Sequence, residues 1–283
     1  MLLQLPRIAI VLCITFLWSS TISFAQAGAL SDRLAAYPDW QHRPMALETA
    51  GELTYPDWLA GNWQVESPLV EAIAPLAPDI ITPGFAAQQA QLHQAVEFPV
   101  RFGPLSLPSP QKCQLRSARP KFALPPPISQ AAEQNEIVAD RAFNGQAIAR
   151  AYLGDAAIAS VTVDPCQRSR QVTHLNPQGK LIATVIAHGQ ETPEANQFIT
   201  VELTHQVFRL GAQIYVNDVE TTTHYQQHQP GQITANQVTA IYLSPQDPDY
   251  FQAGDRPVAL YRYLLSMERK SSPRPTDSQR SGD

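Results

Sequence analysis

A succession of strand-like segments in the second half of the chain is the strongest constraint on its fold. From about residue 157 onward, these segments follow one another with short turns between them, such as residues 176–179 and 229–231. Consecutive strands joined by tight turns predict an antiparallel meander. Such a sheet must protect its two edges, and closure into a barrel is the usual solution. The sequence therefore predicts an all-β fold, a meander closing into a barrel with short N-terminal and inserted helices.

The residue patterns of two of these segments indicate which of their faces are buried. In "QFITVELTHQVFR", apolar residues such as Val201 and Leu203 alternate with polar ones such as Glu202. This pattern indicates one apolar and one polar face. The last segment, "PVALYRYLLSME", is apolar on both faces. We expect it to be covered on both sides, by the N-terminal segment or by a helix. Arg262 lies within this segment, so its charge needs a partner.

The N-terminal 27 residues have the features of a secretory signal peptide. Arg7 precedes an apolar run over residues 8–18, and "AQA" at residues 25–27 matches a signal-peptidase site. The run is too short to cross a bilayer, which needs about 20 apolar residues. The sequence predicts export with cleavage after residue 27; an uncleaved N-terminal anchor is the alternative.

Cysteine and charge content fit an exported protein. Without residues 1–27, two cysteines remain, Cys113 and Cys166. An even number in an oxidising compartment predicts a disulfide, the alternative being two separate thiols. Loss of Arg7 leaves 19 basic and 25 acidic residues, with no basic cluster. Neither nucleic acid nor an anionic membrane surface is therefore an expected partner, since both call for clustered Lys and Arg.

The chain divides into three parts after the signal peptide, the second of which contains an insertion. We expect an N-terminal extension at 28–54 and a β-barrel domain at 55–270. A proline-rich insertion near 104–128 is incompatible with a central strand. The polar tail, 271–283, has the composition of a disordered segment.

The stretch "YPDWLAGNWQVE" opens the barrel domain. Its Gly-Asn-Trp, followed by a meander and an arginine in the last strand, resembles the calycin (lipocalin-like) pattern. The resemblance implies that Trp63 packs at the closed end of the barrel, that Gly61 allows a tight entry, and that Arg262 or Arg269 covers the indole. Such a cation–π contact contributes about 1–2 kcal/mol in a partly dry site.

Longer stretches resemble a group of uncharacterised proteins of cyanobacteria and plant chloroplasts. They include "PDWLAGNWQV", "VADRAFN", "QFITVELTHQVFR", "VETTTHY" and "RPVALYRYLL". Members carry export signals, so the resemblance implies the periplasm or the thylakoid lumen. It implies no reaction.

Four residues are candidate ligand contacts, because small barrels hold one apolar molecule with a few converging polar groups. They are the mid-strand carboxylates Glu202 and Glu220 and the last-strand tyrosines Tyr261 and Tyr263. The two carboxylates qualify only if their faces line the interior; on an outer face they would be ordinary solvated groups.

Other polar residues favour structural roles. Asp140 and Arg141 in "VADRAFN" predict a salt bridge at a strand end, with Arg262 a possible partner of Asp140, and Asn144 is a candidate helix cap. His224 and His228 are four residues apart, but on a strand this places the rings about 13 Å apart, too far to share a metal. We assign no metal ligand.

The sequence thus favours an exported protein that binds a small apolar ligand such as a pigment, quinone or lipid. The alternative is an assembly or interaction factor for photosynthetic membrane complexes that uses residues 68–95 and 104–128 as its contact surface. An enzyme is a weaker hypothesis, because no nucleophile, metal or phosphate-loop motif occurs. No catalytic residue is assigned and the cofactor is unknown.

Overall fold

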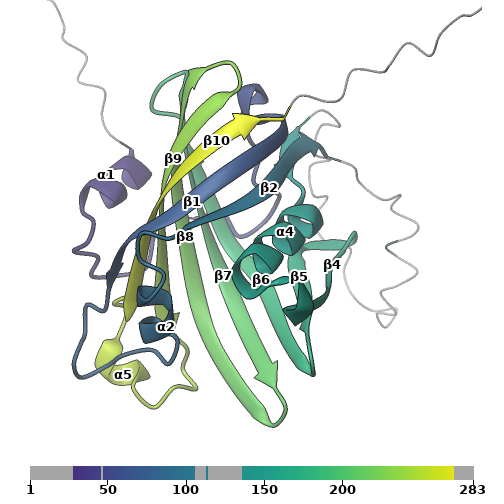
Figure 1. Ribbon diagram of the computed structural model, residues 1–283. Coiled ribbons are helices and arrows are strands. Elements are labelled where there is room, and N and C mark those ends of the chain that lie inside the picture. Colours follow the sequence, from purple (N-terminus) through teal and green to yellow (C-terminus); the bar gives the residue numbers. More distant parts are fainter. Residues whose placement is uncertain (1–27, 46, 106–112, 114–135, 271–283) are drawn as a thin grey trace, which may run out of the picture.

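The computed structural model describes residues 28–45, 47–105, 113 and 136–270. The described strands form one antiparallel sheet in the order β3-β2-β1-β10-β9-β8-β7-β6-β5-β4. This confirms the predicted all-β meander (Figure 1). The strands are β1 (Gly61–Ile73), β2 (Ala95–Pro104), β3 (Ile137–Ala139), β4 (Ile158–Asp164), β5 (Gln167–Leu175), β6 (Gly179–Glu191), β7 (Gln197–Leu210), β8 (Gln213–Gln229), β9 (Gln232–Leu243) and β10 (Ala259–Arg269). The predicted signal peptide, the tail and most of the proline-rich insertion lie outside the described residues.

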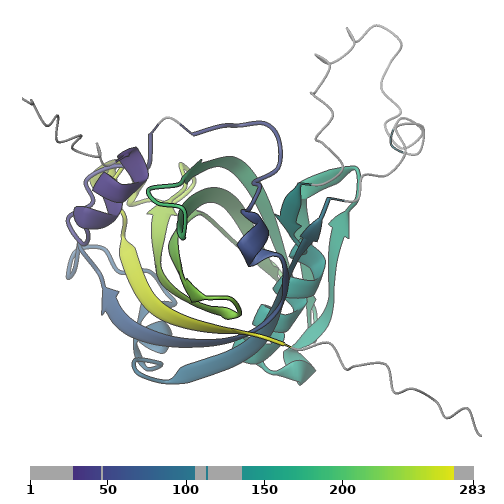
Figure 2. The same ribbon diagram turned by 90° about the horizontal axis from the view of Figure 1, so that it is seen from above.

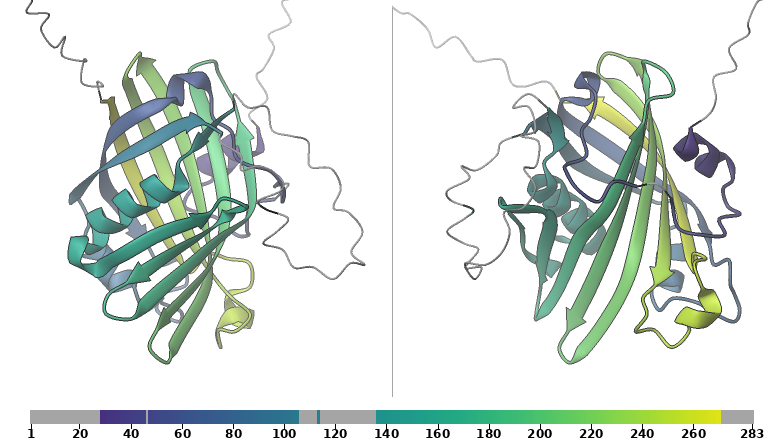
Figure 3. Two further views of the ribbon diagram at one scale, coloured as in Figure 1. Left: turned by 90° about the vertical axis from the view of Figure 1, so that its right-hand side faces the viewer. Right: turned by 180° about the vertical axis from the view of Figure 1, so that it is seen from behind.

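The sheet curls into a half-barrel whose two edge strands, β3 and β4, do not pair with each other. Helix α4 (Arg141–Leu153) lies between these edges and contacts β2, β4 and β5. Figures 2 and 3 show the curled sheet with this helix across the gap. A helix therefore completes the wall where strand-to-strand hydrogen bonds are missing. Pro99 lies on β2 outside the short β3 pairing, where its missing N–H costs no ladder bond.

Both ends of α4 follow from the sequence. Asp140 is the N-cap, and its Oδ1 accepts a hydrogen bond from Phe143 N. Burial alone would raise the pKa of Asp140, but hydrogen bonds from Phe143 N and Arg101 outweigh it and hold the pKa below its usual value. Gly154, at φ +83°, ends the helix.

One prediction around α4 was wrong. Asn144 does not cap the helix; it exchanges two hydrogen bonds with the backbone of Arg101 on β2, at 2.7 and 3.1 Å, and so docks α4 onto the sheet. The predicted salt bridge at the end of β3 is present, but Asp140 pairs with Arg101 at 2.5 Å and not with the alternative partner Arg262, because α4 starts beside β2 and away from β10. Arg262 instead donates to Asn236 and lies 5.6 Å from the Tyr37 ring.

One end of the half-barrel is closed around Trp63. Its side chain is fully buried, and its Nε1 donates to Leu59 O in the short helix η1 (Asp57–Leu59) at 2.8 Å. The Arg269 guanidinium lies 4.8 Å from the indole centre. Of the two arginines considered, Arg269 is therefore the one that covers the tryptophan. Gly61 has φ +127°, and a Cβ there would lie 2.9 Å from Arg269 Nη1.

The outer face of the sheet is covered by the N-terminal extension. Helix α1 (Ala29–Ala35) and the residues after it lie against the outside of the sheet (Figures 1 and 3). Leu30 packs with Ile199 and Val201, and Trp40 packs with Val238 and Leu260. This cover explains why β10 is apolar on both faces, since one side faces the interior and the other faces the extension.

The predicted disulfide is present: Cys113 and Cys166 are bonded, 53 residues apart. It joins the proline-rich insertion to the turn between β4 and β5. Within the described ranges, no helix has the length and apolar character needed to cross a membrane.

We expect Gly61→Ala to destabilise the fold by about 1–3 kcal/mol. An alanine is strained at φ +127°, and its Cβ would crowd Arg269 Nη1. Gly51→Ala is the matched control, since Gly51 also has a positive φ but no atom within 4 Å of the added Cβ. Urea unfolding measures both free energies. Equal losses in the two variants would show that the contact with Arg269 is unimportant.

Candidate functional site

The turn between β7 and β8 determines which side chains line the barrel. Leu210 pairs with Gln213 across Gly211 and Ala212, so Glu202 pairs with Thr221 and Leu203 pairs with Glu220. Because directly paired residues share a face and neighbours alternate, Glu202 and Glu220 lie on opposite faces of the sheet. Only one of the two predicted carboxylates can therefore face the interior.

Glu220 lies on the outer face, under the N-terminal extension. Its side chain is fully buried, and Arg33 of α1 donates to both carboxylate oxygens at 2.6 Å. Tyr242 Oη and Thr222 Oγ1 also donate to it, at 2.7 and 2.8 Å. The Arg33 guanidinium in turn stacks 3.9 Å from the Trp40 ring. Glu220 thus fastens α1 to the sheet and is not directed at the barrel interior.

Glu202 lies on the inner face, where a network of charges holds it. Arg141, the first residue of α4, donates to Glu202 at 2.5 Å, and Glu52 lies 3.8 Å from Arg141. Arg168 pairs with Glu52 at 3.2 Å. Asp140 and Arg141 therefore serve different partners, although they are adjacent in the chain. Two carboxylates and two guanidiniums leave this cluster with no net charge.

Two tyrosines accompany this network at the closed end. Burial, followed by neighbouring charges that include Glu202, raises the pKa of both Tyr55 and Tyr225 far above its usual value. Both phenols therefore stay neutral at physiological pH. A cavity of about 150 Å³, lined by residues that include Glu52, Arg141 and His188, adjoins the network. His188 Nε2 is buried and has no hydrogen-bond partner among the described residues. A polar site of this size suits ordered water.

The opposite end of the half-barrel holds a much larger cavity, of about 800 Å³. Its walls come from the lower ends of β7 to β10 and from the start of helix α2 (Phe85–Gln89). Figure 1 shows this end, with α2, helix α5 (Tyr250–Ala253) and the β7–β8 turn around it. The lining is mostly apolar or aromatic with neutral amides and hydroxyls: Thr82, Pro83, Gly84, Gln88, Phe208, Gln213, Ile214, Tyr215, Asn217, Ile241 and Tyr261. None of these side chains carries a charge.

Of the two predicted tyrosines, only Tyr261 lines this cavity. Its ring stacks on Phe85 of α2 with the centroids 6.0 Å apart. Tyr263 lies one pleat deeper and is already engaged, because Gln88 Nε2 donates to its hydroxyl at 2.7 Å. Burial raises the pKa of Tyr263 well above its usual value. The structure therefore separates the four candidates: Tyr261 at the open end, Glu202 near the closed end, Tyr263 in the packed core and Glu220 outside.

Tyr215 supplies an unsatisfied hydroxyl at the cavity. Its Oη is buried, and although Asn217 is close, no described residue forms a hydrogen bond of normal geometry with it. Buried hydroxyls without partners are uncommon because their desolvation is costly. A ligand oxygen in the cavity would satisfy this donor.

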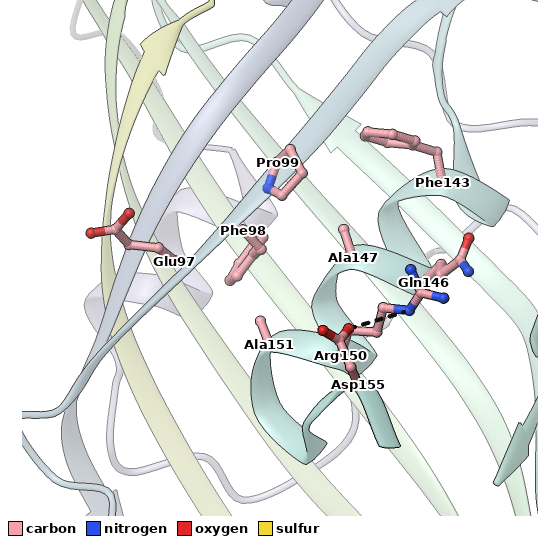
Figure 4. A pocket seen from close by; sticks show the side chains of 9 residues that line it. All are labelled: Glu97, Phe98, Pro99, Phe143, Gln146, Ala147, Arg150, Ala151 and Asp155. Atoms are coloured by element: carbon pink, nitrogen blue, oxygen red, sulfur yellow. Dashed lines mark ion pairs between the residues drawn. The ribbon is translucent and has the colours of Figure 1, made fainter. Parts of the chain in front are cut away.

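A further hollow, of about 380 Å³, lies between α4 and β2. Figure 4 shows Phe98, Pro99 and Phe143 around it, with the Arg150–Asp155 ion pair at one end. It follows the unpaired part of the β2 edge. Its smaller volume and exposed ion pair make it a weaker candidate for a ligand site than the 800 Å³ cavity.

The two histidines four residues apart, His224 and His228, have different hydrogen-bond partners. His224 bonds with Gln197 at 3.0 Å and His228 with Thr234 at 2.8 Å. Burial lowers the pKa of His224, so this ring is neutral at physiological pH. Among the described residues, no group of three or more potential ligands is placed to hold a metal ion.

Sequence reasoning missed most of the cavity wall. Tyr215 and Asn217 lie on the same face of β8 as Thr221, which pairs with Glu202. The glycine turn at 211 would have supplied this register, and with it the opposite orientation of Glu220. The contribution of Thr82–Gln88 had no comparable signal, because it depends on how a loop folds back onto the sheet.

A comparison with protein families assigns the chain to one of them. A family model described as "Domain of unknown function (DUF6816)" matches residues 48–271, most of the chain. The chain belongs to this family. The match includes the whole sheet and α4 but begins after α1, so the Arg33–Glu220 contact joins a segment outside the family domain to the domain itself. No curated protein and no solved structure matches the chain.

We expect Arg33→Met to cost about 3–5 kcal/mol of unfolding free energy, because it leaves the Glu220 carboxylate buried without its cation. Arg150→Met is the control, since the Arg150–Asp155 pair is largely exposed and should contribute less than about 1 kcal/mol. Chemical denaturation followed by tryptophan fluorescence measures both. Similar small losses would contradict a structural role for the buried pair.

Proposed function

We propose that the protein is an exported binding protein for a small, largely apolar molecule with a neutral oxygen at one end, such as a quinone, a pigment or a lipid. The observation that carries the proposal is the 800 Å³ cavity at the open end of the half-barrel. Small-molecule sites span about 300–1,000 Å³ and combine apolar walls with a few polar groups. The cavity has both features.

The chemistry of the lining favours an uncharged ligand. The cavity wall carries no charged side chain, and the inner carboxylate Glu202 is neutralised by Arg141 at the other end. A charged group would lose its hydration at this site without gaining a counter-ion. A carbonyl or hydroxyl oxygen, in contrast, could accept a hydrogen bond from Tyr215 or from the amides of Gln88 and Asn217.

The proposed compartment is the periplasm or the thylakoid lumen. The Cys113–Cys166 disulfide supports an oxidising location. The predicted signal segment at residues 1–27 supports export. Both are compatible with a soluble carrier for molecules that reside in a neighbouring membrane.

The proposal predicts binding of the neutral fluorophore N-phenyl-1-naphthylamine. Asn217→Trp should fill the cavity and weaken this binding about tenfold or more, equivalent to about 1.4 kcal/mol or more. His174→Trp is the matched control, because it adds the same side chain at an exposed strand position that does not line the cavity. Fluorescence titration gives both affinities, and circular dichroism checks the fold.

Protein purified from its native compartment would identify the ligand by absorption spectroscopy and non-denaturing mass spectrometry. A stoichiometric apolar adduct that leaves on unfolding would support a carrier. No fluorophore binding by the wild type, together with an unliganded mass after exposure to membrane extract, would overturn the proposal and favour an assembly factor that acts through protein contacts.

A further inference from the structure

A continuous row of polar side chains crosses the inner face of the sheet, from the wall of the 800 Å³ cavity to the charge network around Glu202. Its members are directly paired in succession on five consecutive strands: Tyr261 on β10, then Thr239, Thr221 and Glu202, and His188 on β6. Directly paired residues share a face, so all these side chains point to the interior. Because barrel strands are tilted to the axis, such a row runs from one end of the barrel toward the other.

The neighbouring row on the closed-end side is polar as well. It contains Tyr263, Gln237, Thr223 and Thr200, again directly paired in this order. Beyond this row the inner face becomes apolar around Trp63. We call the two rows together the polar belt. It separates the apolar floor of the half-barrel from the mostly apolar cavity at the open end.

Several polar groups of the belt have no partner. The hydroxyls of Thr200, Thr221 and Thr239 form no hydrogen bond with any residue that the structure describes. Thr221 and Thr239 are only half-buried, although they lie on the inner face in the middle of the sheet. At the end of the first row, His188 is 7% exposed and its Nε2 is unpartnered. Buried polar groups normally have partners, so the belt offers open hydrogen-bonding positions to an occupant of the interior.

The belt offers no free charge to a ligand. Its carboxylate, Glu202, is paired with Arg141, and Arg141 also lies 3.8 Å from Glu52. A charged group would therefore lose its hydration here without gaining a counter-ion. Uncharged hydroxyl groups, in contrast, both donate and accept hydrogen bonds, as the threonine hydroxyls do.

We propose that the ligand is an amphiphile with an uncharged, hydroxyl-rich head group such as a sugar. The head group enters first and lies against the polar belt, and the apolar chain occupies the cavity at the open end. This inference rests on the proposed function and names the ligand class of the same site. Directly paired side chains lie about 5 Å apart, so one head group with several hydroxyls reaches successive threonines. A site built from hydroxyls discriminates against ligands that leave them unpaired.

The test is isothermal titration calorimetry with amphiphiles that share an octyl chain and are kept below their critical micelle concentrations. The probes are octyl β-D-glucoside, octyl sulfate and octyltrimethylammonium, with free glucose as the head group alone. We expect octyl glucoside to bind about tenfold or more tightly than either charged amphiphile. Free glucose should bind about tenfold or more weakly than octyl glucoside, because it has no chain to fill the apolar cavity.

A double variant separates the belt from the cavity. Thr221→Val/Thr239→Val removes two belt hydroxyls but keeps the side-chain shape and the strand preference. It should weaken octyl glucoside binding about tenfold, and change the affinities for octyl sulfate and N-phenyl-1-naphthylamine less than about twofold. Thr162→Val/Thr184→Val is the matched control, because it makes the same exchange at two strand positions on the outer face. It should change none of these affinities, and urea unfolding checks that each variant is folded.

The possible failures are distinguishable. Equal affinities for octyl glucoside and the charged amphiphiles, or equal effects of the belt and control variants, would overturn the inference and leave the carrier function standing. Free glucose that binds as tightly as octyl glucoside would overturn the amphiphile and assign the belt to a free sugar. No binding of N-phenyl-1-naphthylamine or of any octyl compound would reject the carrier function, and the inference with it.

Discussion

The half-barrel depends on helix α4, which covers the gap between two sheet edges that the strands leave unpaired. Strands β3 and β4 end the sheet without pairing, and unpaired edges invite association with other chains. Helix α4 fills the gap through polar contacts made at both sides. Asn144 bonds the β2 backbone, and Arg141 reaches Glu202 on β7 across the interior. The Arg141–Glu202 pair thus ties the first residue of α4 to the inner face of β7.

The two carboxylates of the central strands show how one sheet uses opposite faces for different purposes. Glu202 anchors the helix that completes the wall, and Glu220, on the neighbouring strand, anchors the N-terminal extension on the outside. Each carboxylate is neutralised by arginine. These contacts leave the 800 Å³ cavity at the open end without charges of its own, which supports the proposal of an apolar, neutral ligand.

The two ends of the half-barrel differ in physical character. At the closed end, Trp63 packs beneath Arg269 and the chain enters through Gly61, whose missing side chain leaves room for the guanidinium. At the open end, the cavity has a mostly apolar lining without charged side chains. A packed end and an opposite end with an apolar cavity suit a container that exchanges its contents at one surface.

Local alternation and an even cysteine count in the sequence predicted the meander and the disulfide between Cys113 and Cys166, both of which the structure contains. The Gly-Asn-Trp resemblance predicted an arginine over Trp63 but left Arg262 and Arg269 as alternatives, and the structure places Arg269 there. The register of β8, and hence the opposite faces of Glu202 and Glu220, was also within reach through the turn at Gly211. Only the tertiary structure decided that Asn144 docks on β2, that Arg141 crosses to Glu202 and that a loop at Thr82–Gln88 walls the cavity. These contacts join residues 40 or more positions apart, and no local pattern encodes which distant surfaces a curled sheet brings together.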